Sequence, residues 1–300
     1  MNLKNISIFT LIILIFTACQ AKPAPITHKI EKECQFYSLK TALCETQEQM
    51  INSLKPYQVI FIGDHHPEDK LHKNIASLIT ALSKDGTKVH LASEWFYPSD
   101  APILKKFANK DINETSFLEE IKWKKRLKYN KYESFKPMYQ AVINSGGKLY
   151  GINLSKEDRK KISDQNLSAM SKEELTFNNS LDLEVNPHKS LVMPFLSFCH
   201  APKKGESQEN CIKRMYRVQV AWDSKMAQES YKLSKQLKPN EKLIVFAGSM
   251  HLEKKLGIPL RFSRLTNEPF VTIIPANQKT HKVENDIGDY IIFYHELKEK

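Results

Sequence analysis

The sequence predicts an α/β protein with a mainly parallel β-sheet flanked by helices, together with a smaller helical domain or lid. One observation is a pattern that occurs twice, an apolar run that leads into Gly-x-x-His, at Val59–His66 and at Leu243–His251. Unbroken β-branched and aromatic runs are typical of strands buried on both faces, which are the strands of parallel sheets. A second observation is that strand and helix patterns alternate along the chain, as in βαβ units. The glycine after each run predicts a sharp turn that leaves the histidine at the carboxyl edge of the sheet, where α/β proteins bind ligands.

The N-terminus predicts an export signal. Ile6–Phe16 is almost wholly apolar and too short to span a bilayer, so residues 1–18 are expected to be a signal peptide. The residues before Cys19 resemble a bacterial lipobox, with Phe16 in place of the usual leucine. This resemblance implies that Cys19 is lipidated, with palmitate among the expected acyl chains, and is the first mature residue. The alternative is an ordinary signal cleaved after Ala18, which would leave a free thiol in an oxidising compartment.

The other four cysteines form two close pairs, Cys34 with Cys44 and Cys199 with Cys211. An even number of cysteines at short spacing predicts two local disulfides in an exported protein. Four unpaired thiols are the alternative. Cys199 beside His200 could also indicate a metal or thiol site, but no Cys-x-x-Cys accompanies it.

The chain has 300 residues and a formal net charge of +11. A mature chain of this length can bury one large core or two modest ones. The positive charge favours anionic partners such as haem propionates, phosphates or anionic lipid headgroups, although a solvated lysine-rich surface explains much of it. Nucleic acid is a poor partner for an exported lipoprotein.

Residues 19–50 are predicted to be a lipidated tether and leading segment, residues 51–158 and 212–300 the α/β core, and residues 159–211 a smaller helical insertion. The first strand is followed by a helix that opens at Pro67 and ends at Asp85-Gly86, and then by a strand over Lys88–Phe96. The remaining expected elements follow in order: a helix capped at Ser116-x-x-Glu119 and running to Lys128, a helix over Phe135–Asn144, a strand over Lys148–Leu154, a helix opening at Ser155-x-x-Asp158, a long helix over Gln208–Leu237, and strands over Phe270–Pro275 and Tyr290–His295.

Several polar residues stand at or just past the carboxyl ends of these strands. They are Asp64, His65, His66, Glu94, Asn153 and His251. A ligand, metal or substrate is the usual compensation for burying such groups together, so the set predicts one polar pocket. Taken singly, each has a plainer interpretation: His66 could cap the next helix, and Glu94 could pair with a lysine.

The order and spacing of the motifs resemble the ChaN-like haem-binding lipoproteins over residues 57 to about 262. The segments that carry the resemblance are Val59–His66, Glu94–Phe96, Trp123 with Tyr132 and Pro137, Gly147–Asn153, Gln219–Ala227 and Gly248–Arg261. Asp64 departs from the Gly-Glu that is usual in the wider family. The resemblance implies haem as the bound group, in a surface pocket at the interface of a homodimer. It also implies iron ligation by a tyrosine, and histidine and lysine from the partner subunit on the propionates.

The resemblance does not single out the tyrosine. The candidate iron ligands are Tyr150 beside Lys148, Tyr97 after Glu94, and Tyr132 in a basic aromatic segment, although each could be a packing residue. The candidates for the propionates are His65, Lys70, His72, His200 and Lys203. The lipobox and the family together imply a lipid anchor on the outer membrane that faces the periplasm, and an iron or haem receptor as a possible partner.

Two alternatives remain open. The paired Gly-x-x-His motifs also resemble TraB/TIKI-type metalloproteases and erythromycin-esterase-like enzymes, in which case His66, Glu94 and His251 would hold a divalent metal. The chain has neither a His-Glu-x-x-His helix nor a Gly-x-Ser-x-Gly elbow. The other alternative is a non-catalytic scaffold at the outer membrane that binds neither chromophore nor metal.

Overall fold

The computed structural model describes residues 26–30, 34–65, 68–127, 131–277, 279–280 and 282–294. The expected signal peptide, Cys19 and His66 lie outside these residues. None of the helices within the described ranges is long and apolar enough to span a bilayer.

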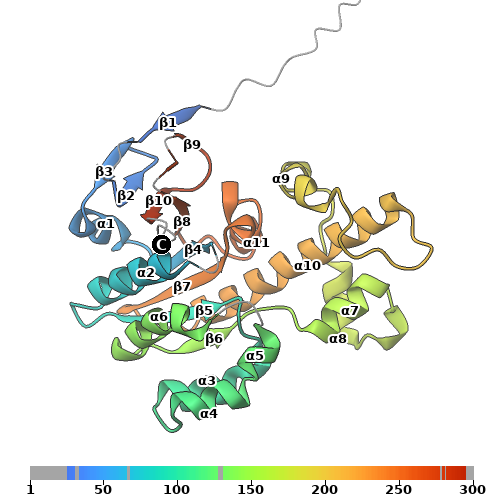
Figure 1. The fold of residues 1–300 in the computed structure, drawn as a ribbon, viewed down its shortest axis with the longest axis horizontal. Helices are drawn as coiled ribbons and strands as arrows, with labels where there is room; N and C mark the ends of the chain where they lie inside the picture. Colours follow the sequence, from blue (N-terminus) through green and yellow to red (C-terminus); the bar gives the residue numbers. More distant parts are fainter. Residues whose placement is uncertain are drawn as a thin grey trace, which may run out of the picture.

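An eight-stranded sheet forms the centre of the molecule (Figure 1). Its strand order is β3-β2-β10-β8-β4-β7-β5-β6, and the neighbours from β10 to β6 are all parallel. This confirms the predicted fold class. The strands of this sheet are β2 (Phe36–Ser38), β3 (Leu43–Glu45), β4 (Val59–Asp64), β5 (Lys88–Ser93), β6 (Leu149–Gly151), β7 (Glu241–Gly248), β8 (Phe270–Asn277) and β10 (Tyr290–Tyr294). A separate two-stranded sheet pairs β1 (Thr27–Lys29) with β9 (Lys282–Glu284).

Helices cover both faces of the sheet because alternate residues of its strands are apolar on both sides. In β4, Ile60 and Ile62 belong to the core beneath α2 (Asp69–Leu82) and α6 (Tyr132–Asn144). Phe61 belongs instead to the core beneath α10 (Gln208–Ser234) and α11 (Ile258–Ser263). On the first face lie also α1 (Gln47–Leu54), α3 (Ala101–Ala108), α4 (Glu114–Glu120) and α5 (Trp123–Arg126).

The leading segment is part of the core fold. Strands β2 and β3 extend the main sheet in antiparallel fashion beside β10. Phe36 is fully buried, and Cys34 bonds to Cys44 with their Cα atoms 5.5 Å apart. Residues 34–45, within the predicted tether and leading segment, therefore form an edge of the main sheet.

The helical insertion projects from one end of the sheet (Figure 1). It comprises α7 (Lys156–Asp164), α8 (Lys172–Asn179) and α9 (Asn186–Leu196). Helix α10 runs unbroken from this insertion onto the sheet, so the expected boundary at residue 211 falls inside a helix. The disulfide between Cys199 and Cys211, with Cα atoms 5.9 Å apart, joins the loop after α9 to the first turn of α10.

Three local predictions are wrong: the turn at Gly63, the cap at Ser116 and the unbroken helix to Lys128. Gly63 lies inside β4 and makes no turn; a Cβ there would lie 2.6 Å from Pro275 Cδ and 2.7 Å from Ser249 Oγ, so this glycine permits close packing. The expected cap at Ser116 also differs, because Asn113 caps α4 by accepting from the Ser116 amide. That helix ends before Lys122, whose left-handed backbone (φ 55°) starts α5. The cap at Ser155 forms as the sequence indicates, and Ser171 caps α8.

Candidate functional site

A buried carboxylate network closes the α10 side of the sheet's carboxyl edge. Asp223 of α10 is fully buried, and its Oδ1 lies 2.5 Å from His251 Nδ1. Its Oδ2 lies 2.9 Å from His188 Nε2 of α9 and 3.8 Å from Arg261 Nη1 of α11. The Asp223 carboxylate of α10 thus connects the end of β7, helix α11, and helix α9 of the helical insertion.

Two of the predicted polar residues join His251 in this network. Glu94 Oε1 lies 3.8 Å from His251 Nε2, and the Gly248 amide donates to Glu94 Oε2 at 2.7 Å. Asn153 Nδ2 donates to the backbone carbonyl of Glu94 at 2.7 Å. The fold thus brings Glu94, Asn153 and His251 together at the carboxyl edge.

The charges in this network balance. Burial alone would lower the pKa of His251, but Glu94 and Asp223 outweigh burial and raise that pKa to about 9. Burial would raise the pKa of Asp223, but His251, His188 and Arg261 bring it well below its ordinary value. His251 is therefore an imidazolium at neutral pH, which suits an ion pair and not a general base.

Asp64 makes its contacts on the other face of the sheet. His72 Nε2 lies 2.8 Å from Asp64 Oδ1, and His72 Nδ1 lies 2.8 Å from Ser134 Oγ. All three residues are buried. His72 therefore lies in the interior, and it is removed from the candidates for the propionates. The expected single pocket is divided between the two faces of the sheet, since Asp64 faces α2 while His251 faces α10.

The three candidate tyrosines lie in different surroundings. Tyr97 follows β5 at the carboxyl edge, is half-buried, and carries the Arg126 guanidinium 4.6 Å above its ring centroid. Tyr132 is only 3 % exposed and packs edge-on against Trp123 at 5.3 Å. Tyr150 lies within β6, with its ring 6.0 Å from that of His90 and on the α10 face of the sheet.

Burial raises the pKa of Tyr132, with further contributions from Glu114 and Glu133. Burial and Glu241 raise the pKa of Tyr150. Both environments disfavour the phenolate that ligates ferric iron. Tyr132, as a buried core residue, does not fit the role of an iron ligand.

The candidate propionate partners separate into two groups. His65 and Lys70 lie where β4 leads into α2, and His65 Nδ1 is 2.9 Å from the Tyr294 hydroxyl. Lys70 is half-buried and forms no ion pair with a carboxylate of the described residues. His200 and Lys203 lie on the insertion; the former contacts the Phe195 carbonyl at 2.7 Å and the latter the carboxylate of Asp164 at 2.7 Å.

The basic aromatic segment around α5 borders a cavity of about 850 Å³. Its apolar wall is formed by Leu118, Trp123 and Leu127. Four lysines line it without an ion pair to any carboxylate in the described ranges: Lys122, Lys124, Lys125 and Lys131. Because Arg126 of the same helix stacks on Tyr97, α5 links this cavity to a candidate iron ligand.

Sequence reasoning missed the buried partners of His251. Asp223 stands in the motif Gln219–Ala227, but a carboxylate in the middle of an amphipathic helix gives no sign that it is buried. His188 of α9 and Arg261 of α11 contact Asp223 in turn. These residues are far apart along the chain, so no local sequence pattern predicts their contact.

The chain is an α/β protein with a mainly parallel sheet, a helical insertion, and buried histidine and carboxylate side chains at the carboxyl edge of the sheet. Residues 50–262 match the model of the family described as "Haem-binding uptake, Tiki superfamily, ChaN", and the chain belongs to this family. No curated protein sequence matches the chain.

Among solved structures, the chain is similar to ChaN of Campylobacter jejuni, whose structure is described as showing cofacial heme binding. The two are 20 % identical, with a TM-score of 0.67 over 85 % of this chain and 94 % of that one. The type III effector HopBA1 is 13 % identical, with a TM-score of 0.47 over 84 % of this chain and 94 % of that one. The erythromycin esterase EreC is 13 % identical, with a TM-score of 0.41 over 81 % of this chain and 77 % of that one.

The network predicts a loss of stability at alkaline pH. A folded-state pKa of about 9 for His251, against 6.5 for a free histidine, stabilises the fold fully below pH 6.5. This contribution, on the order of 3 kcal/mol, is lost as the pH rises through about 9. Urea unfolding between pH 6 and pH 10 should show the decline, and His251→Gln should be less stable at pH 6 and lack it. A wild-type decline that is unchanged in His251→Gln would contradict the assignment.

Proposed function

We propose that this protein binds haem at its surface and that Tyr97 ligates the iron. Membership of the haem-binding family supports haem as the bound group. The observation that carries the choice of residue is the position of Tyr97: partly exposed, at the carboxyl edge of the sheet, with a guanidinium over its ring.

The chemistry of Tyr97 suits this role. Ferric haem prefers a hard anionic ligand, and a tyrosine phenolate is one that proteins use. The Arg126 guanidinium lies 4.6 Å from the centroid of the Tyr97 ring, in a cation–π contact that orients the ring. Arg126 is held in place by Asp100, to which it donates from Nη2 at 3.1 Å. The positive charge is therefore positioned by the fold before any ligand arrives.

The lysines around α5 suit the remainder of haem. Haem is an apolar ring with two carboxylates, and the cavity beside α5 combines Trp123 and Leu127 with lysines that lack carboxylate partners. Charge-assisted hydrogen bonds from lysine to a carboxylate are among the stronger polar contacts in proteins.

We further propose that a homodimer completes the site, with Lys70 and His65 of each protomer adding to the α5 lysines of the other in holding the propionates of the haem that the other ligates. Lys70 is chosen because it is partly exposed and forms no described ion pair, and His65 because it belongs to the same β4–α2 region of the chain. His200 and Lys203 are the second choice, because Lys203 is already paired with Asp164 of α7 whereas Lys70 has no described ion pair, and His200 contacts the Phe195 carbonyl of α9.

The same proposal includes export and anchoring. Lipidated Cys19 would hold the protein on the outer membrane, facing the periplasm, where an iron or haem receptor could pass haem to it. The apolar N-terminal segment and the two disulfide-bonded pairs support an exported protein.

No specific observation favours the metal-dependent hydrolase. Within the described residues, no three His, Cys, Asp or Glu side chains are placed to share a metal ion. Glu94 and His251 are engaged with each other and with Asp223, and His66 lies outside the described ranges. We therefore propose haem binding alone.

Hemin titration of three matched Tyr→Phe variants tests the iron ligand. Wild-type protein should bind one hemin per protomer with a high-spin ferric charge-transfer band, and Tyr97→Phe should lose that band. Tyr150→Phe and Tyr132→Phe, which remove a hydroxyl of the same kind, should keep it. Loss of the band in Tyr150→Phe with retention in Tyr97→Phe would transfer the assignment to Tyr150.

Mixing two defective variants tests the shared site. Tyr97→Phe lacks the iron ligand, and the double variant Lys70→Met/His65→Ala lacks the propionate partners. In a mixed dimer one of the two sites contains an intact Tyr97 and intact partners from the other protomer. An equimolar mixture should therefore recover part of the charge-transfer band, with a hemin-dependent dimer in sedimentation. Absence of recovery, with each variant folded, would show that both sets act within one protomer.

A further inference from the structure

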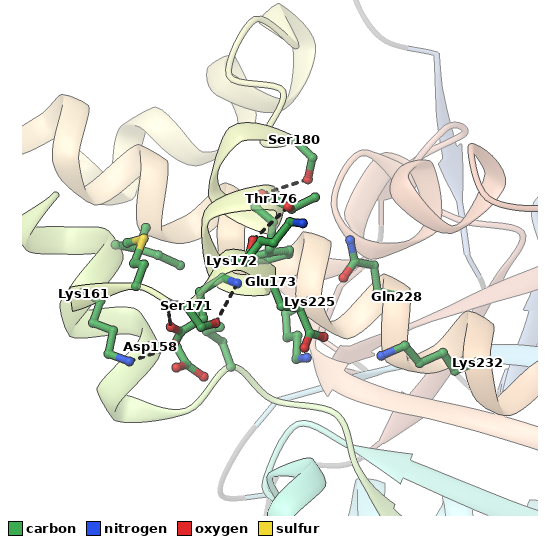
Figure 2. A pocket seen from close by; sticks show the side chains of 15 residues that line it. Asp158, Lys161, Ser171, Lys172, Glu173, Thr176, Ser180, Lys225, Gln228 and Lys232 are labelled. Atoms are coloured by element: carbon green, nitrogen blue, oxygen red, sulfur yellow. Dashed lines mark hydrogen bonds and ion pairs between the residues drawn. The ribbon is translucent and has the colours of Figure 1, made fainter. Parts of the chain in front are cut away.

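A second cavity, of about 950 Å³, lies in the helical insertion between α7, α8 and α10 (Figure 2). Ligand pockets in proteins commonly have volumes of about 300–1,000 Å³. None of the residues that line this cavity belongs to α5 or to the carboxyl edge around Tyr97. The proposed haem site does not use it.

One side of this cavity is apolar. Leu154, Ile162 and Met170 are buried at its base, with Phe177 of α8 beside them. The nearby hydroxyl of Thr176 donates to the Lys172 carbonyl at 2.9 Å, within its own helix. This side therefore offers a surface suited to hydrocarbon.

The opposite side carries positive charge on one face of α10. Lys225, Gln228 and Lys232 recur at helical spacing and line the cavity, as Figure 2 shows. Lys225 and Lys232 both pair with Glu229, at 2.8 Å and 2.9 Å. The Lys225 and Lys232 ammonium groups therefore share the carboxylate of Glu229 on α10.

The carboxylates that line the cavity lie on the α7 and α8 side, and two of them already have partners. Glu174 accepts from the Ser171 amide and pairs with Lys161 at 2.7 Å, while Asp158 accepts from Ser155 at 2.7 Å. Glu173 is the third, and it neighbours Lys172, which forms no ion pair among the described residues. The α10 side thus remains the place for an anionic group.

We propose that this cavity binds a single acyl chain with an anionic head, as in a long-chain fatty acid. The chain would lie on Leu154, Met170 and Phe177, and the head would contact Lys225 and Lys232. Haem fits less well, because no tyrosine, histidine or cysteine lines the cavity to ligate its iron.

Displacement of a dansyl-labelled undecanoic acid from the purified protein tests this site. Laurate should displace the probe, and dodecanol, which has the same chain without a charge, should do so at least about tenfold more weakly. Lauroyl lysophosphatidate is the second anionic competitor. Displacement by either anion supports the site, and the tighter of the two identifies the source of the head group.

The matched variants separate the head contact from general effects. Lys225→Met/Glu229→Gln/Lys232→Met removes both ammonium groups without leaving an unpaired carboxylate, and it should weaken laurate at least about tenfold while leaving dodecanol unchanged. Lys124→Met/Lys125→Met removes two charges beside α5 and should bind laurate as the wild type does. Phe177→Ser should weaken both laurate and dodecanol.

Three results would overturn the proposal: no saturable binding of the probe to wild-type protein, equal binding of laurate by the triple variant, or stoichiometric displacement of the probe by hemin together with loss of hemin binding in the triple variant. The last result would make this cavity the haem site. If the wild-type protein does not bind hemin but laurate still displaces the probe, only the proposed haem-binding function is contradicted.

Discussion

Asp223 keeps its negative charge in the protein interior, and the arrangement of the elements around it follows from that constraint. An ionised carboxylate removed from water is strongly unfavourable unless charged or hydrogen-bonding groups replace its hydration. Its partners come from the end of β7, from α9 and from α11. These segments are separated along the chain, so the network fixes the insertion, the long helix α10 and the sheet relative to one another.

The network also buries His251 and Asp223 at the carboxyl edge of the sheet on the α10 side. In α/β proteins this edge is where ligands commonly bind. Here His251 is charged and held between Glu94 and Asp223, while Asp64 is engaged with His72 on the other face. Available functional groups are found beside this edge, at the partly exposed Tyr97 and at the lysines around α5, which form no ion pair within the described ranges.

The sequence predicts the parallel sheet well because β4 and β7 are continuous apolar runs, and such runs have few other structural solutions. It also predicts Glu94, Asn153 and His251 as neighbours, because the ends of parallel strands meet at one edge. It misplaces His72, whose burial depends on a serine 62 residues away in another helix. Similarly, the role of Gly63 is steric and depends on Pro275, which no local pattern reveals. Contacts set by long-range packing are the ones that periodicity and spacing leave undetermined.

Our central claim is that haem binds beside α5 and that the Asp223–His251 network at the sheet edge is structural. A crystal structure of the hemin-loaded protein would test this claim most directly. We predict iron bonded to the Tyr97 phenolic oxygen beside α5, with Asp223 still paired to His251. Iron within bonding distance of His251 or Glu94, with the Asp223 pair broken, would contradict it.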